Sequence, residues 1–584
     1  MSSTGLAQTG EEKINERINE GRRGFFRRSA VGAGSAILVE AASVPPAIAK
    51  DSEDGPASPS TRPFIEVLPV PMIKQPLAAL SPAPAITRGD GECGRDDHQR
   101  WGDFEPVKLY ELHVKEALHS FHRDLPTQPV WGYDGIVPGP TFVARYNEPV
   151  LVRIHNDLPA NHIGWGSPEI TTHLHNLHTA SESDGFTGDY YSATRYGPTL
   201  TGPGRYRDHH YPNCYAGYDA YPLTHGDSRE AMGTLWYHDH RLDFTGPNVY
   251  RGLSGFYLLF DALDSGDEND PNPEALRLPS GVGEYDIPLV IQDRRFDRKG
   301  MLYFDPFNSD GLLGDKFLVN GKIQPLFEVE RRKYRFRILD GGPARFYELY
   351  LQYKNADQEF TYIANDGNLL PAPLAMKKVR LGVAERADIV IDFSKYPLGS
   401  QLFLVNKLQQ DDGRGPDDKL LDKPVQLLRF DVKAEARRPD NSRVPARLRE
   451  LPPIPSAADL KKLRTREFEF DRSNGGWTVN GQFFDISKPA AQVKRGSEEV
   501  WVLKGKGDWH HPVHIHFEEG RILSRNGKAP PAHEAGRKDV YVLVPGEEIR
   551  VFLRFRDYEG KYLMHCHNGM HEDHAMMVRY DVVP

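Results

Sequence analysis

The feature that most constrains this chain is a short segment near its C-terminus, His565-Cys566-His567-Asn568-Gly569-Met570-His571-Glu572-Asp573-His574-Ala575-Met576. The residues before it have the pattern of a turn that leads into a strand. Because alternate side chains of a strand share a face, His565 and His567 should point to one side and Cys566 to the other. Cys566, His571 and Met576 together offer the donor types of a blue-copper electron-transfer site. The alternative is a buried free cysteine with unrelated histidines nearby.

The histidines of the chain are divided between its two ends. All 23 lie within residues 1–240 or 510–584, and none lies within 241–509. A site made of imidazoles must therefore be formed by the first and last parts of the chain, with the middle part as a spacer or a wall. Interfaces between domains are also common places for ligand sites.

Three further short histidine clusters accompany the C-terminal segment. They are His173-Leu174-His175, His238-Asp239-His240 and His511-Pro512-Val513-His514-Ile515-His516. Two histidines separated by one residue of a strand point to the same face. One such pair is weak evidence, but several pairs that face each other can hold more than one metal ion. Imidazole-rich sites suit copper, zinc, iron or nickel, and the set with Cys566 favours copper.

Between these clusters the sequence has the pattern of an all-β protein. Short β-branched or aromatic runs, such as 141–146 and 150–154, are separated by Gly, Pro and Asn. This spacing is typical of antiparallel β-sandwiches rather than of alternating strands and helices. A length of 584 residues suggests about three or four domains. We expect sandwich domains over 64–262, 280–433 and 465–584, with a linker over 434–464.

The N-terminus carries the signals of an export leader. Two arginine pairs lie within 22–28, a modest apolar run follows over 30–39, and Ala47-Ile48-Ala49 fits a cleavage site. This pattern predicts a twin-arginine signal peptide over 1–49, followed by a flexible arm over 50–63. Export by the twin-arginine machinery to the periplasm or the medium is then expected. The alternative is an ordinary basic amphipathic N-terminus.

Composition argues against several other partners. The net charge is −9 and no polybasic run follows the leader, so nothing indicates nucleic-acid binding. No later stretch has 18 consecutive apolar residues, so no membrane span is expected. If Cys566 binds metal, Cys93 and Cys214 remain, and the sequence leaves open whether they form a disulfide or stay as free thiols.

The four clusters, in this order, resemble the signature motifs of the multicopper oxidase family. The segments 139–141, 248–253 and 319–321 also look like the family, so the resemblance covers nearly the whole mature chain. It is strongest to the bacterial laccase branch, which includes spore-coat laccase, bilirubin oxidase and phenoxazinone synthase. The resemblance implies three cupredoxin-like Greek-key β-sandwich domains, of which the second holds no metal and the third holds the type 1 copper. We expect a monomer.

The resemblance also implies ligands for four copper ions per chain. The type 1 copper would be held by His511, Cys566, His571 and the axial Met576, and the type 2 copper by His173 and His514. The two type 3 coppers would be held by two sets of three histidines: His175, His238 and His567, and His240, His516 and His565. Asn176 stands where the family usually has glycine, which costs little only if its backbone is left-handed.

The resemblance implies an oxidase that takes single electrons from a small reducing substrate and reduces O2 to water, with Cys566 as the electron path between the copper sites. Asp184 and Glu572 match acidic positions that supply protons in the bacterial laccase branch, and their alternative is a role as ordinary loop carboxylates. An axial Met576 suggests a type 1 copper of lower potential, which favours phenols, aminophenols or bilirubin-like pigments.

Other functions fit the residues less well. A periplasmic metallo-oxidase that acts on Cu(I) or Mn(II) is the main alternative, although the chain has only nine methionines and no methionine-rich insert. A non-catalytic cupredoxin scaffold is disfavoured because every ligand position is kept. A zinc hydrolase would need an open three-ligand site with a base and would leave Cys566 and Met576 unexplained.

Overall fold

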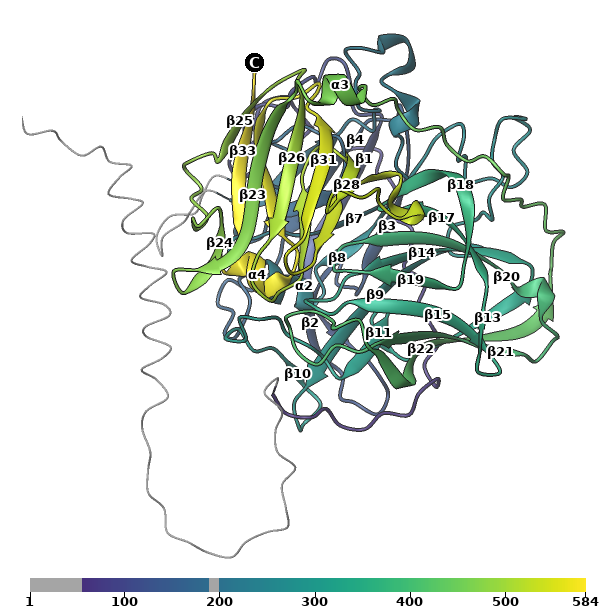
Figure 1. Cartoon of the computed structure of the whole chain (residues 1–584). Coiled ribbons are helices and arrows are strands. Elements are labelled where there is room, and N and C mark those ends of the chain that lie inside the picture. The colour runs from purple at the N-terminus through teal and green to yellow at the C-terminus, as the bar shows by residue number, and fades with distance from the viewer. Residues whose placement is uncertain (1–54, 189–198) are drawn as a thin grey trace, which may run out of the picture.

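The computed structural model describes residues 55–188 and 199–584, and the expected twin-arginine leader lies outside them. Strands dominate the described chain and its helices are short (Figure 1). The predicted all-β class is therefore confirmed. Six sheets account for the strands, two in each successive third of the chain.

The first pair of sheets is built from residues 108–260 and has four strands in each sheet. Their orders are β2-β1-β4-β6 and β3-β8-β7-β5. The strands are β1 (Lys108–His119), β2 (Gln128–Tyr133), β3 (Gly139–Arg145), β4 (Val150–Asn156), β5 (Thr172–His175), β6 (Tyr206–Tyr211), β7 (Thr234–Asp239) and β8 (Ser254–Phe260). Leu112, Ile154 and Leu235 belong to the core between them.

The second pair is built from residues 286–435. One sheet has the order β12-β11-β9-β14-β20-β17-β18 with β10 beside β9, and the other β13-β22-β21-β15-β16 with β19 beside β15. The strands are β9 (Asp286–Phe296), β10 (Leu302–Tyr303), β11 (Lys316–Val319), β12 (Lys322–Ile323), β13 (Leu326–Arg331), β14 (Lys333–Asp340), β15 (Tyr347–Tyr353), β16 (Ala356–Gln358), β17 (Phe360–Asn365), β18 (Asn368–Met376), β19 (Lys378–Leu381), β20 (Arg386–Asp392), β21 (Gln401–Leu408) and β22 (Leu420–Glu435).

The third pair is built from residues 464–583, with the orders β24-β23-β26-β31-β28-β29 and β25-β33-β32-β27-β30. The strands are β23 (Arg464–Ser473), β24 (Gly476–Val479), β25 (Ala491–Lys494), β26 (Glu498–Gly505), β27 (His511–Ile515), β28 (Gly520–Arg525), β29 (Arg537–Lys538), β30 (Val540–Leu543), β31 (Glu548–Arg554), β32 (Gly560–Cys566) and β33 (Met577–Val583). The α-helices of the described residues are α2 (Thr245–Arg251), α3 (Ala457–Leu460) and α4 (Gly569–Asp573), and α2 lies against α4 (Figure 1).

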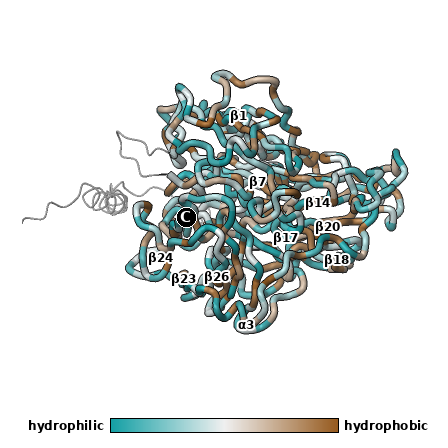
Figure 2. The backbone as a smooth tube through the Cα atoms, turned by 90° about the horizontal axis from the view of Figure 1, so that it is seen from above, coloured by the Kyte–Doolittle hydropathy of each residue, from teal (hydrophilic) through white to brown (hydrophobic). Residues whose placement is uncertain are grey.

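Burial along the strands shows how these segments pack. In β23, Phe468 and Phe470 are buried and alternate with more exposed residues, as expected where one face of a sheet is buried. In contrast, β7, β8 and β9 are buried along their whole length. Hydrophobic and hydrophilic stretches follow one another along the tube in Figure 2. None of the helices in the described ranges is both long and apolar enough to cross a membrane.

Residues 55–63 differ from the flexible arm expected over 50–63. The Ser58 hydroxyl accepts a hydrogen bond from the Phe296 backbone at 2.8 Å, and the Ser58 backbone donates to Asp315 at 2.9 Å. Arg62 also pairs with Asp124. This described part of the arm is therefore held on the first and second pairs of sheets.

The two cysteines outside the C-terminal segment are free thiols in the structure. Cys93 lies 3.2 Å from the Thr201 hydroxyl, and Cys214 lies 3.8 Å from the Tyr558 hydroxyl. Both side chains are buried, and no disulfide joins them.

A buried histidine on β6 should make the stability of the fold depend on pH. The Nε2 of His210 donates a hydrogen bond to the Phe104 carbonyl at 2.7 Å, and burial lowers its pKa to about 4. The unfolded chain has the ordinary pKa of about 6.5, so between these values it binds a proton that the folded chain does not. Stability is therefore lost as the pH falls below 6.5, by about 2 kcal/mol at pH 5 from this group alone.

His210→Gln tests this dependence because glutamine keeps an N–H donor but cannot be protonated. We expect the Tm of the wild type to fall by more between pH 7 and pH 5 than the Tm of the variant, as measured by calorimetry. An equal fall in both proteins would show that His210 does not contribute.

Candidate metal centre

Three buried donor atoms meet inside the C-terminal pair of sheets. The Nδ1 atoms of His511 and His571 are 3.2 Å apart, and the Sγ of Cys566 lies 3.6 Å and 3.5 Å from them. His511 begins β27, Cys566 ends β32 and His571 lies on α4. Such separations fit three ligands on one ion with bonds of about 2.0–2.3 Å. The structure therefore brings together this predicted ligand set.

The hydrogen bonding of His571 leaves the correct nitrogen for a metal. Its Nε2 lies 3.0 Å from the Asp310 carbonyl oxygen. A carbonyl can only accept, so Nε2 carries the hydrogen and Nδ1 presents its lone pair to Cys566. Met576 is fully buried in the same hydrophobic cluster as Cys566, and its carbonyl accepts a hydrogen bond from the Cys566 backbone at 3.0 Å.

Eight histidines from the first and third pairs of sheets form a second centre. Across β5 and β7, His173 lies opposite His238, and across β27 and β32, His514 lies opposite His565. The eight are His173, His175, His238, His240, His514, His516, His565 and His567, and all are buried. The structure therefore brings together the predicted histidines from the two ends of the chain.

The shortest contacts within this centre join Nε2 atoms of histidines from different strands. The Nε2 of His565 lies 3.1 Å from that of His240 and 3.2 Å from that of His516. The Nε2 atoms of His173 and His514 are 3.4 Å apart. The contacts of His240 with His565 and of His173 with His514 link the first and third pairs of sheets through the predicted ligands.

The contact between His173 and His514 brings two nitrogen lone pairs together. The Nδ1 of His173 donates to the Asp184 carbonyl at 2.5 Å, and the Nδ1 of His514 donates to the Asp539 carbonyl at 3.0 Å. Both Nε2 atoms therefore present lone pairs to each other, an unfavourable contact that a bound metal ion would relieve. Burial lowers the pKa of both imidazoles well below its usual value, which keeps them in the neutral form that binds metal.

The third predicted ligand set also has buried imidazole nitrogens without hydrogen-bond partners. His175, His238 and His567 have ring centroids 5.2–5.8 Å apart. The Nδ1 of His175 and the Nε2 atoms of His238 and His567 are buried and have no hydrogen-bond partner. Unpartnered buried nitrogens are costly, so these three lone pairs on neighbouring rings are suited to bind a metal ion. The residues present fit a metal cluster held by imidazoles.

Both predicted carboxylates touch this centre. The Asp184 carboxylate lies 2.7 Å from Nδ1 of His516, and burial raises its pKa well above the usual value. The Glu572 carboxylate lies 3.2 Å from Nδ1 of His565 and 3.6 Å from Nδ1 of His240. Burial acts to raise the pKa of Glu572, but the two imidazoles beside it outweigh burial and lower that pKa.

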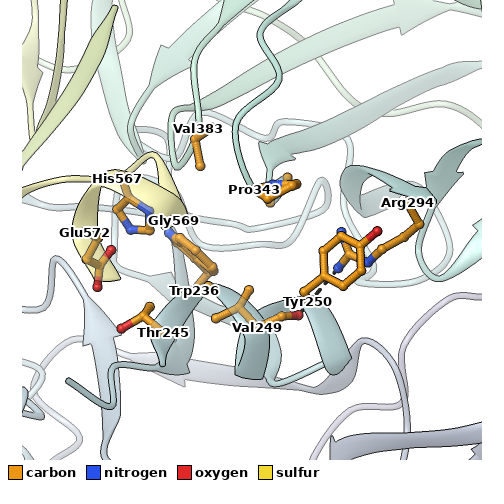
Figure 3. A pocket seen from close by; sticks show the side chains of 13 residues that line it. Trp236, Thr245, Val249, Tyr250, Arg294, Pro343, Val383, His567, Gly569 and Glu572 are labelled. Atoms are coloured by element: carbon orange, nitrogen blue, oxygen red, sulfur yellow. Dashed lines mark hydrogen bonds between the residues drawn. The ribbon is translucent and has the colours of Figure 1, made fainter. Parts of the chain in front are cut away.

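A narrow cavity connects Glu572 to the junction of α2 with the middle sheets (Figure 3). Its volume of about 20 Å³ is roughly enough for one water molecule. His567 and Glu572 line one end, and Tyr250 and Arg294 line the other. The Glu572 carboxylate therefore borders a small internal space next to the histidine centre.

Two charged residues that the sequence did not indicate support this centre. Asp539 lies 3.4 Å from Nε2 of His175, and Arg386 of the middle sheets donates to the Asp539 carboxylate at 2.7 Å. Carboxylates that contact a metal-binding histidine fix its tautomer and orientation. No sequence pattern relates Arg386 to Asp539, because they are brought together only by the packing of the middle and last pairs of sheets.

Aromatic residues cover the imidazole of His571 and were also not predicted. The Trp477 ring lies 3.8 Å from the His571 ring between centroids, at an angle of 33°. Trp509 lies edge-on to Trp477 at 5.1 Å, and it is partly exposed. Arg472 lies over both tryptophan rings. Two indole rings thus lie between His571 and the partly exposed edge of Trp509.

Three other histidines near the ligands have separate partners. His178 pairs with Asp557 at 2.8 Å, the backbone N–H of His510 donates to the Arg414 carbonyl at 2.7 Å, and the Nδ1 of His574 donates to the Met570 carbonyl at 2.5 Å. These histidines are consistent with the expected supporting or surface roles.

Asn176 has a φ of 72°. This left-handed conformation is the one that asparagine tolerates in place of glycine.

Comparison with known proteins gives the family. Family models described as multicopper oxidase match residues 115–199 and 455–584. The chain is 33% identical to bilirubin oxidase of Albifimbria verrucaria over 536 residues, which cover 90% of this chain and 82% of that protein. It is 34% identical to a laccase of Bacillus stratosphericus, covering 82% of this chain and 97% of that protein.

The fold is also found in solved structures. The McoA multicopper oxidase from the hyperthermophile Aquifex aeolicus is 25% identical, with a TM-score of 0.66 over 82% of this chain and 97% of that chain. Its match extends across all three pairs of sheets, in agreement with the cupredoxin-like architecture expected for them. The chain is a copper-dependent oxidoreductase of the multicopper oxidase family that uses O2 as its electron acceptor.

Proposed function

We propose that the chain holds four copper ions in the ligand sets implied by its sequence, as a laccase-like oxidase of small organic donors. The observation that carries the proposal is the contact at 3.4 Å between Nε2 of His173 and Nε2 of His514, two buried lone pairs that would serve as ligands of a metal ion. Copper in these sets would supply one-electron uptake at the Cys566 site and reduction of O2 to water at the histidine centre.

Cys566 is placed to connect the two centres. Its Sγ faces His511 and His571, while its neighbours His565 and His567 reach the histidine centre. An electron that enters at the Cys566 thiolate therefore has to cross only the backbone between adjacent residues to reach the imidazole of His565 or His567. Because the thiolate site is buried, little solvent has to reorganise when an electron arrives.

Asp184 and Glu572 are proposed to deliver the protons that O2 reduction consumes. Each carboxylate touches an imidazole of the histidine centre, and Glu572 also borders the water-sized cavity. A carboxyl group within reach of both water and the reacting site can act as a proton shuttle.

Phenols, aminophenols and bilirubin-like pigments are the proposed donors. The relatives named laccase and bilirubin oxidase support this range. The tryptophans over His571 fit it, since indole faces favour aromatic molecules. Copper-loaded protein should be blue with a near-ultraviolet shoulder, and metal analysis should give the proposed copper content. A colourless protein after full copper loading would refute the assignment.

Metal ions are the second candidate donors. Turnover of a phenol should exceed turnover of Cu(I) or Mn(II) when all are compared at equal enzyme concentration. The opposite ranking would favour the periplasmic metallo-oxidase function.

Trp477 is expected to carry electrons from bulky donors to His571. Trp477→Leu removes the ring that lies 3.8 Å from His571 and should lower kcat for phenols by roughly tenfold, which is about 1.4 kcal/mol of barrier. The blue band should remain, because none of the three donor atoms is changed. Steady-state kinetics and the visible spectrum measure both effects, with Trp101→Leu as a control remote from the centre.

Export through the twin-arginine machinery, residence in the periplasm or the medium and a monomeric state are also proposed. The support for export is the pattern within residues 22–49. Replacing Arg22 and Arg23 by lysine should retain the protein in the cytoplasm, as seen by cell fractionation.

A further inference from the structure

A second group of metal-binding side chains lies on the outer face of the sheet β2-β1-β4-β6. His113 on β1 and His155 on β4 are direct neighbours across parallel strands, and their rings stack at 4.6 Å with an angle of 6°. Glu111 precedes His113 by two residues and so shares its face. One donor atom from each of the three residues lies within 4.8 Å of the others.

We propose that Glu111, His113 and His155 form a binding site for a divalent transition-metal ion, with Zn²⁺ or Cu²⁺ as the favoured ions. The Nε2 of His155 donates a hydrogen bond to one oxygen of Glu111 at 2.9 Å, and the Nε2 of His113 lies 3.9 Å from the other. A bound ion would take the place of the hydrogen between His155 and Glu111. Two imidazoles and a carboxylate are a common ligand set for these ions. Zn²⁺ and Cu²⁺ lie at the strong-binding end of the divalent series.

Asp157 prepares His113 for this role. Its carboxylate lies 2.7 Å from Nδ1 of His113 and can only accept while ionised, so Nδ1 carries the hydrogen. The lone pair of His113 then lies on Nε2, the nitrogen that faces Glu111. A carboxylate on the far nitrogen of a metal-binding histidine fixes the ring and increases its basicity. Asp157 is thus a positioning residue.

Arg153, the positively charged residue paired with Glu111 in the strand register, already forms an ion pair with Asp208. Arg153 lies opposite Glu111 across β1 and β4, but its guanidinium makes two bonds of 2.7 Å to Asp208. Because Arg153 is committed to Asp208, the charge of Glu111 remains available to a bound ion.

The proposed site differs from the oxidase centre in its access to solvent. The side chains of Glu111, His113 and His155 are 31%, 39% and 23% exposed, whereas the ligands of the histidine centre are buried. An ion held by the three donors would keep open positions for water and would exchange with the medium. The site therefore binds metal reversibly, independently of the copper ions that the fold encloses.

The test is calorimetric titration of Zn²⁺ into the copper-loaded, full-length enzyme. We expect one Zn²⁺ per chain whose affinity falls at least about 100-fold in a variant with both His113→Gln and His155→Gln. Asp157→Asn should weaken the site by roughly 10–100-fold. His225→Gln, which changes an exposed histidine elsewhere, should leave the affinity unchanged.

The blue absorption and Tm of each variant establish that it is folded and copper-loaded. The proposal is overturned if the wild type takes up no Zn²⁺, or if the double variant binds Zn²⁺ as tightly as the wild type. Because the measured quantity is zinc affinity, failure of this site would be distinct from failure of the oxidase assignment.

Discussion

Cys566→Ser is expected to reduce the oxidation of phenols at least about a thousandfold, which corresponds to about 4 kcal/mol of barrier. Cys566 supplies the only sulfur within 3.6 Å of both His511 and His571 among the described hydrogen-bonding contacts. A serine hydroxyl is similar in size but does not ionise at neutral pH, so it cannot replace a thiolate as a ligand. The blue band should disappear with the activity.

The fold and the histidine centre should survive this change. Cys566 is fully buried and serine fills nearly the same space, so the Tm of the apoproteins should differ little. Metal analysis should show that one copper per chain is lost while the others remain. Cys214→Ser is the matched control, because Cys214 is equally buried but contacts Tyr558 rather than imidazoles. A blue, active Cys566→Ser protein would contradict the assigned electron path.

The sequence predicted the histidine sets because strand periodicity acts over very short distances. The spacing of His173 and His175, or of His565 and His567, determines which side chains share a face without knowledge of the rest of the fold. The absence of histidine from 241–509 then left only the two ends of the chain as sources of ligands.

The contribution of the middle sheets was not predictable in this way. A spacer or a wall is expected there, yet Asp310 accepts a hydrogen bond from His571 and Arg386 binds the Asp539 carboxylate beside His175. The residues in each of these pairs are more than one hundred positions apart in the chain. One contact uses a backbone carbonyl, which no residue type marks, and the other uses a charge pair that many alternative partners would satisfy.

The contact of Trp477 with His571 could not be predicted either, because it also depends on how distant elements pack. Trp477 begins the return strand of a hairpin, β23 to β24, and its apolar side chain reads as part of an ordinary core. Only the packing of α4 against this hairpin places the indole ring on the imidazole. Local patterns thus identify metal ligands, whereas the residues that control access to them depend on how distant elements pack.

Glu572→Gln should lower kcat for O2 reduction by roughly 100-fold, within the range for loss of a proton-transfer group. Glutamine has nearly the same shape and retains a polar contact with His565, but it cannot release and regain a proton. The donor atoms around Cys566 are not altered, so the blue band should persist. Stopped-flow reoxidation of the reduced enzyme by O2 isolates this step from electron uptake at His571.

Glu559→Gln provides the control for this experiment, because Glu559 pairs with Arg495 at 2.8 Å away from the histidine centre. Its rate of reoxidation should equal that of the wild type. If Glu572→Gln loses the blue band, the carboxylate holds the structure of the site rather than moving protons. If the band and the rate both persist, protons reach the centre by another carboxyl group, and Asp184, with its raised pKa and its contact with His516, becomes the residue to replace.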